Sequence, residues 1–259
     1  MRLMKRILSA AAVLALSASL LVGCSNGTAS SVPVSASSAA ESTVSSVEET
    51  ASSAVDENEA AAAQLLNDLT GSYQELWPVI LADEYKQTWL DDCTALVGED
   101  NAEAAFEKLS SMVTGDVYGE DAVKAYANGG GAYFCGFTNS LATLTFDGET
   151  STISGTDKDG NVLFSHTYHY IGMEPVHGLY EFESDDADFG EFTYFFLAPD
   201  TSAETYHIEF RYGSDAEALS QYDAGEYAYW VASGISTDCD QTMICLLYTS
   251  PSPRDAHES

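Results

Sequence analysis

Positive charge is scarce in this sequence. Its 259 residues contain nine Lys and Arg against 41 Asp and Glu, which gives a formal net charge of −32 at pH 7. A field of this sign repels nucleic acid and anionic lipid headgroups, and it attracts cations and basic partners. The composition therefore excludes a nucleic-acid-binding protein. Much of the negative charge serves only to keep the protein soluble.

Paired cysteines and catalytic motifs are also lacking. Apart from Cys24 and the C-terminal Cys245, the cysteines are Cys93, Cys135 and Cys239, and none forms a C-x-x-C pair. No thiolate zinc site is expected, and three thiols cannot all pair within one chain, so single buried thiols are the simplest interpretation. The sequence contains no G-x-S-x-G, H-E-x-x-H or P-loop motif. It therefore does not predict an enzyme.

The N-terminus has the features of a bacterial export signal. Three basic residues within the first six precede an uncharged run of small and apolar residues over 7–22. Such a run is typical of a signal peptide and is short for a membrane span. The sequence LVGC that ends at Cys24 resembles a lipobox. This resemblance implies cleavage of the signal peptide, residues 1–23, and lipidation of the Cys24 thiol.

Two further segments are expected to lie outside the folded domain. Residues 24–56 are rich in Ser, Ala, Thr, Val and Glu and contain no aromatic residue. Such a segment buries too little apolar surface to offset its ordering entropy, so it is expected to be a flexible tether. Residues 245–255 read CLLYTSPSPRD, which resembles a translated sequencing adapter, so no function is assigned to 245–259. The domain is expected over 57–244.

The first part of this domain has helical patterns. Residues 57–69 are rich in helix formers, and 72–96 carries apolar residues at helical spacing with a break at Pro78. Shorter helices are expected over 102–113 and 121–127, before a run of three glycines. A helical stretch is expected again at 215–219, and another after Asp238.

From residue 132 the apolar pattern changes to a period of two. Glycine and aspartate turns separate seven candidate strands, namely 132–138, 141–147, 150–155, 161–170, 178–184, 191–197 and 205–212. Residues 157–161 lack the spacing of an EF-hand and are expected to form a hairpin turn. The fold class is therefore mainly β with flanking helices, in the form of an antiparallel barrel.

Three segments resemble the ZinT (YodA) family in their order along the chain. They are 70–81 (TGSYQELWPVIL), the meander 141–172, and 192–231, in which a strand ending in Ala-Pro precedes a His-containing strand ending in glycine. The family consists of exported, lipocalin-like (calycin) zinc-binding proteins. In Gram-positive bacteria the same domain is fused to zinc-importer lipoproteins. The resemblance implies a lipocalin-like barrel and zinc as the cofactor.

The resemblance also implies a metal site in which this sequence departs from the family. The family uses two histidines two places apart on the strand matching 206–213, and here these positions hold His207 and Glu209. A third histidine belongs on the strand matching 192–199, and here that position holds Phe195, which cannot bind a metal. Glu209 is still a zinc ligand type. Phe195→His is therefore expected to strengthen binding.

The strand pattern itself leaves two interpretations open. Residues two apart on a strand point to the same face, so His207 and Glu209 project together, opposite the aromatic and apolar residues between them. They form either a ligand-bearing face or, if the aromatic side is the core, a solvated outer face. In the second case Arg211 on the same face pairs with Glu209.

The remaining histidines of the domain have different expected roles. His166 and His169 lie three apart on one strand and face opposite sides, so they cannot bind one ion together. His166 is expected to be a hydrogen-bonded wall residue. His177 lies in a loop beside Glu174, where it is expected as a mobile third ligand. Glu191 and Tyr194 are alternative neighbours for that role.

Taken together, these features predict an extracytoplasmic lipoprotein that is anchored to the bacterial cell membrane through Cys24. Its expected role is to bind a divalent metal, zinc first, at His207, Glu209 and His177, and to deliver the metal to an importer. The first alternative is a metal-free module that binds a small apolar ligand in an aromatic barrel, which Phe195 favours. The second alternative is a structural surface lipoprotein without a ligand.

Overall fold

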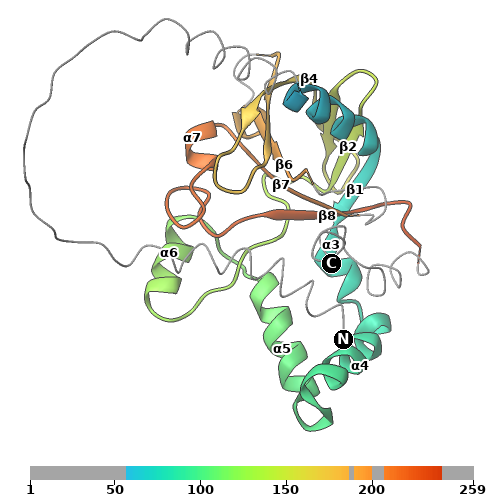
Figure 1. The fold of residues 1–259 in the computed structure, drawn as a ribbon, viewed down its shortest axis with the longest axis vertical. Coiled ribbons are helices and arrows are strands. Elements are labelled where there is room, and N and C mark those ends of the chain that lie inside the picture. The colour runs from blue at the N-terminus through green and yellow to red at the C-terminus, as the bar shows by residue number, and fades with distance from the viewer. Residues whose placement is uncertain (1–56, 187–189, 200–206, 241–259) are drawn as a thin grey trace, which may run out of the picture.

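Eight antiparallel strands form a closed barrel in the computed structural model, which describes residues 57–186, 190–199 and 207–240 (Figure 1). The strands follow one another around the barrel in chain order, and the last pairs with the first. The predicted mainly β barrel with flanking helices is confirmed. The predicted signal peptide, the tether and residues 245–259 lie outside the described residues.

Each strand forms an antiparallel ladder with the next strand along the chain. The strands are β1 Gly71–Glu75, β2 Thr143–Asp147, β3 Thr152–Thr156, β4 Val162–Met173, β5 Tyr180–Ser184, β6 Tyr194–Leu197, β7 His207–Gly213 and β8 Ala232–Ser236. Because alternate side chains of a strand point inward, closure of the barrel gathers the alternating apolar residues into one core.

The turn between β3 and β4 shows why residues 157–161 form a hairpin. The Asp157 carboxylate accepts hydrogen bonds from the backbone N–H groups of Asp159 and Asn161, both at 2.9 Å. Gly160 has φ +82°, a left-handed conformation that glycine adopts without strain. The predicted hairpin turn is confirmed.

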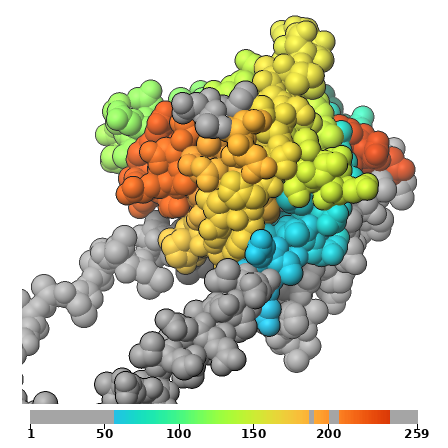
Figure 2. Space-filling model, turned by 90° about the horizontal axis from the view of Figure 1, so that it is seen from above, coloured from blue at the N-terminus to red at the C-terminus, as the bar shows by residue number. Residues whose placement is uncertain are grey.

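Helices cover one end and one side of the barrel. The described helices are one over residues 57–68, α3 Leu76–Ile80, α4 Lys86–Val97, α5 Ala102–Val113, α6 Glu120–Ala127 and α7 Ala216–Leu219, with single 3-10 turns at Asp83–Tyr85, Glu99–Asn101 and Gly190–Phe192. The helix over 57–68 buries Ala62, Leu65 and Leu66 in the barrel core. In the space-filling view it lies directly against the strand residues (Figure 2).

A helical arm of α3, α4 and α5 extends from the other side of the barrel (Figure 1). Its apolar side chains pack around Ile235 of β8 in a separate cluster with Leu76, Ile80, Tyr85, Trp89 and Leu109. The Trp89 indole N–H donates to the carbonyl of Ile80 at 2.8 Å. The arm therefore covers the outer side of β8, next to β7. None of the described helices is long and apolar enough to span a bilayer.

Two element predictions were wrong, and one strand was not predicted. Residues 72–75, the start of the helix predicted over 72–96, belong to β1, because Tyr73 points into the barrel and pairs with Leu144 and Ser236. The predicted strand 132–138 is irregular and makes only isolated bridges through Phe134. β8 was not predicted, since its sequence ASGIS lacks a pattern of large apolar residues. In all three cases pairing with distant residues overrides the local pattern.

Candidate functional site

β7 places His207 and Glu209 on one face of the sheet, as the spacing predicted. In the antiparallel pairing with β8, His207 lies opposite Ile235 and Glu209 lies opposite Ser233. The alternate residues Ile208 and Phe210 point into the barrel and are 1% and 0% exposed. The aromatic side of β7 is therefore the core, and the imidazole and carboxylate lie half-buried on the face turned away from the barrel interior, hereafter the outer face.

The outer face of β7 is not a solvated surface, because Arg211 on it is completely buried. Its guanidinium donates to the backbone carbonyls of Leu219, Gln221 and Tyr227. Burial lowers the pKa of Arg211. The interpretation that Arg211 pairs with Glu209 is wrong, since the guanidinium instead holds the segment over 214–231 against the barrel.

Glu209 has a buried thiol as a neighbour that the sequence did not single out. Burial, together with the charge of Glu209, raises the pKa of Cys135 to about 12. The carbonyl of Cys135 accepts from the backbone N–H of Ser233, which pairs with Glu209 across the sheet. Backbone pairing of residues far apart in sequence creates this proximity, and no motif in the sequence indicates it. At this pKa Cys135 is a neutral thiol at neutral pH.

Phe195 lies on the opposite side of the sheet from His207 and Glu209. It pairs with Tyr212, is 0% exposed, and packs with its ring 5.4 Å from the Tyr212 ring and 6.4 Å from the Phe210 ring. A side chain at position 195 points into the barrel interior. The expectation that a histidine there would complete the metal site is therefore wrong.

His177 does not act as a mobile donor in this structure. Its side chain is 12% exposed, and Nδ1 lies 3.5 Å from Oε2 of the fully buried Glu174. Its ring centroid lies 3.7 Å from that of Tyr222. Burial alone would raise the pKa of Glu174, but hydrogen bonds from His177 and Val176 outweigh it and lower that pKa. His177 is thus packed in the loop that follows β4.

The two other suggested neighbours are also engaged elsewhere. Glu191 accepts hydrogen bonds from Ser214 at 3.2 Å and from the Tyr227 hydroxyl at 3.0 Å. The Tyr194 hydroxyl donates to Glu183 at 3.1 Å. Among residues 57–186, 190–199 and 207–240, no group of three or more His, Cys, Asp or Glu side chains is close enough to hold a metal ion.

His166 and His169 occupy opposite faces of β4, as predicted. His166 Nδ1 lies 2.5 Å from Asp186 Oδ2, and its ring stacks beside Phe164 at the barrel wall. His169 is half-exposed, and its Nδ1 lies 2.7 Å from Asp185 Oδ1. The two imidazoles anchor the residues that follow β5.

Aromatic side chains fill the barrel interior where the apolar-ligand alternative would place its ligand. The Phe164 ring lies 4.2 Å from the Phe192 ring and 5.8 Å from the Phe195 ring, and the stack continues to Phe210 and Tyr212. These rings occupy the lumen that a lipocalin-like ligand needs, so the structure gives no support to that alternative.

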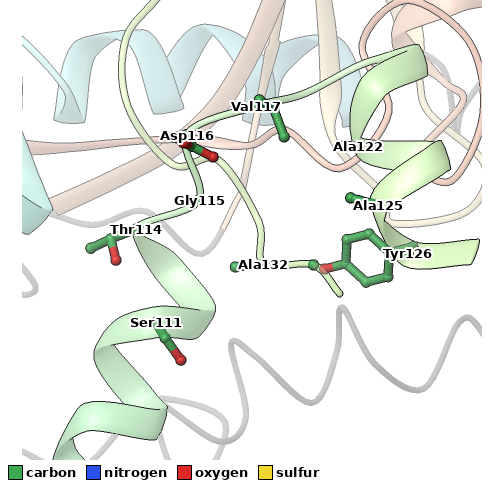
Figure 3. Close-up of a pocket in the computed structure, with 10 residues that line it drawn as sticks. Ser111, Thr114, Gly115, Asp116, Val117, Ala122, Ala125, Tyr126 and Ala132 are labelled. Atoms are coloured by element: carbon green, nitrogen blue, oxygen red, sulfur yellow. The ribbon is translucent and has the colours of Figure 1, made fainter. Parts of the chain in front are cut away.

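A surface cavity of about 360 Å³ lies between the C-terminal end of α5 and α6 (Figure 3). Ser111 and Thr114 form one wall, Ala125 and Tyr126 form another, and Asp116 is the one ionisable carboxylate among its lining residues. None of the predicted metal ligands lines this cavity. It is therefore separate from the outer face of β7.

Comparisons with family models and with curated proteins give no match. Among solved structures, the chain is similar to the Zn(II)-bound ZinT-like domain of Streptococcus pneumoniae AdcA, with 17% identity and a TM-score of 0.42, over 69% of this chain and 89% of that one. It is also similar to Zn(II)-bound AdcA from the same organism, with 17% identity and a TM-score of 0.43, over 71% of this chain and 35% of that one. Structural similarity at this identity and TM-score does not identify metal-binding residues in this chain.

Proposed function

We propose that this chain is an extracytoplasmic lipoprotein that binds a divalent metal, zinc first, through His207 and Glu209, for delivery to an importer. The observation that supports the proposal is the placement of an imidazole and a carboxylate two residues apart on the half-buried outer face of β7. Zinc accepts both donor types, and partial burial reduces competition from water.

The proposed site is incomplete as a protein-only coordination sphere. Zinc prefers four donors, and two of the three side chains named from the sequence share this face, whereas His177 is packed against Glu174 and Tyr222. Water must then fill the remaining positions. We therefore expect affinity well below that of a site with three histidines, because each protein ligand lost corresponds to several tenfold steps of about 1.4 kcal/mol.

The charge of the chain supports a cation over an anion as the bound species. A formal net charge of −32 raises the local concentration of cations around the protein. This effect is non-specific, so it contributes to encounter rather than to selectivity. Selectivity for zinc must come from the imidazole of His207, which magnesium and calcium sites rarely use.

Calorimetric zinc titration of the protein from residue 57 onward tests the site. We expect one zinc per chain for the unchanged protein, loss of binding in His207→Ala, and at least about a tenfold weaker affinity in Glu209→Gln. His169→Ala is the matched control, since it removes a half-exposed histidine from β4 and leaves β7 intact. Wild-type affinity in His207→Ala would place the site elsewhere.

A further inference from the structure

Two tyrosine rings lie face to face between α6 and the segment over 214–231. The ring centroids of Tyr126 and Tyr229 are 3.7 Å apart, and the ring planes differ by 6°. Carbon atoms separated by about 3.5–4.0 Å are in van der Waals contact, so the two faces touch. Aromatic pairs generally prefer offset or edge-to-face arrangements with centroids farther apart. The surrounding chain therefore holds this pair closer than ring packing alone requires.

The backbone fixes the position of Tyr229. Its φ is +57°, a left-handed conformation that bulky side chains rarely adopt. The N–H of Tyr229 donates to the carbonyl of Tyr222 at 2.8 Å, and its carbonyl accepts from the N–H of Phe134 at 3.0 Å. A strained conformation persists only where the surrounding structure over-determines it, and such residues concentrate at functional sites. The strain at Tyr229 therefore indicates that the stacked pair is more than a packing contact.

Neighbouring residues also confine the ring of Tyr126. A Cβ added at Gly131 would lie 2.5 Å from two carbons of this ring, so glycine lets the backbone pass against it. The Tyr133 ring meets both partners edge-on, with its centroid 6.3 Å from that of Tyr126 and 5.7 Å from that of Tyr229. Tyr126 and Tyr229 are nonetheless only half-buried, and Tyr126 lines the surface cavity beside α6 (Figure 3). Both rings are thus confined and within reach of solvent.

This arrangement favours one reaction of tyrosine, the coupling of two phenol rings. Burial raises the pKa of Tyr126 and of Tyr229, so both are neutral phenols at neutral pH. A one-electron oxidant takes an electron from each phenol, the phenolic proton leaves to water, and the unpaired electron spreads to the ring carbons next to the oxygen. Two such radicals in contact form a carbon–carbon bond between these carbons. Each bonded carbon then loses its hydrogen as a proton, and each oxygen regains one.

We propose that Tyr126 and Tyr229 form an oxidative cross-linking site, at which a one-electron oxidant such as peroxide with a haem peroxidase joins the two rings. Two electrons and two protons leave the pair, and one peroxide molecule takes up both and becomes two molecules of water. Contact between the rings replaces the encounter of two radicals by a step within one chain. The bond ties α6 to the segment over 214–231. Neither tyrosine belongs to the proposed metal pair, so the site does not depend on the proposed function.

Oxidation of the unchanged full chain tests the site directly. The purified chain is illuminated briefly with a ruthenium tris-bipyridyl complex and persulfate, which supply the one-electron oxidant. Fragment mass spectra should show the peptides of Tyr126 and Tyr229 joined with the loss of two hydrogen atoms, and dityrosine fluorescence should rise in parallel. Links that join Tyr133, or two different chains, in preference to this pair would overturn the proposal.

Tyr126→Phe and Tyr229→Phe test the pair while keeping both rings. Each should abolish the link within the chain, because phenylalanine has no phenol to oxidise. Tyr180→Phe is the matched control, since it removes a hydroxyl from the edge-to-face pair of Tyr170 and Tyr180, whose centroids lie 5.9 Å apart. It should give the same yield as the unchanged protein. Equal yields in all three variants would contradict the assignment of the link to the stacked pair.

The link should also stabilise the fold. It joins residues far apart in the sequence and so restricts the unfolded chain, as a disulfide does. We expect the linked protein to unfold at a higher temperature than the same sample before oxidation, and oxidised Tyr126→Phe should show no such rise. A linked protein that unfolds at the same or a lower temperature would mean that the native stack does not accommodate the bond, which would overturn the proposal.

Discussion

At the scale of single residues, the side of the sheet on which a residue lies decides its role. Phe195 and His207 occupy neighbouring strands, yet one points into the barrel and the other away from it. Sequence spacing within one strand predicts which residues share a face, but it does not relate the faces of two strands. The pair on β7 could be predicted for this reason, and the position of Phe195 relative to it could not.

Phe195→His tests this assignment of faces. We expect the substitution to leave zinc affinity unchanged and to lower the free energy of unfolding by about 2–4 kcal/mol, because it places a polar ring in a fully buried aromatic stack. Zinc calorimetry and urea unfolding provide the two measurements. Phe195→Leu is the control for packing alone. Tighter zinc binding in Phe195→His would show that position 195 faces the metal pair.

Glu174 is expected to make the stability of the protein depend on acid pH. Its pKa is lowered from the ordinary value of 4.5 because hydrogen bonds from His177 and Val176 outweigh the effect of burial. A group with a lowered pKa in the folded state contributes stability above the unfolded value, and this contribution is lost as pH falls through the folded pKa. We therefore expect the free energy of unfolding to decrease as the pH is lowered below about 4.5.

Glu174→Gln removes this titration and provides the comparison. The variant should be less stable than the unchanged protein at pH 7, and the difference should shrink as the pH is lowered. Urea unfolding from pH 7 down to pH 3 measures both curves. Parallel curves would mean that Glu174 has no part in the acid dependence.

At the scale of elements, the segment over 214–231 depends on one side chain of β7. Arg211 donates to three carbonyls of this segment, and Asp215 caps α7 within it by accepting from the N–H of Ala218 at 3.0 Å. Trp230, near its end, is buried in the barrel core. The segment connects β7 to β8, the strand that pairs with β1, so its attachment contributes to the stability of the whole domain.

Arg211→Met should lower the free energy of unfolding by about 3 kcal/mol, because it leaves several buried carbonyls without a charged donor. Urea unfolding measures the change, and fluorescence of Trp230 reports loosening of the segment. Lys124→Met, which removes an exposed cation paired with Asp121, is the control and should leave stability nearly unchanged. An Arg211→Met protein as stable as the parent would mean that the segment is held by its apolar contacts alone.

At the scale of the whole molecule, attachment to a membrane remains a prediction from the sequence around Cys24. In a bacterial host, Cys24→Ser should block lipidation, so the protein should lose its membrane anchor or remain unprocessed. Fractionation and mass determination of the mature N-terminus measure both outcomes. A variant that is processed normally and stays with the membrane would contradict the predicted anchor. Zinc binding by the domain does not depend on this result.

The sequence alone determined the class of fold. Alternating apolar residues between glycine and aspartate turns favour antiparallel strands, whichever strands finally pair. It also determined that His207 and Glu209 share a face, since that follows from strand geometry. Tertiary structure decided what depends on distant pairing. It made 71–75 a strand, placed Cys135 beside Glu209, turned Phe195 inward and directed Arg211 to the backbone. These outcomes depend on which strands meet and in which register, and no local pattern encodes that choice.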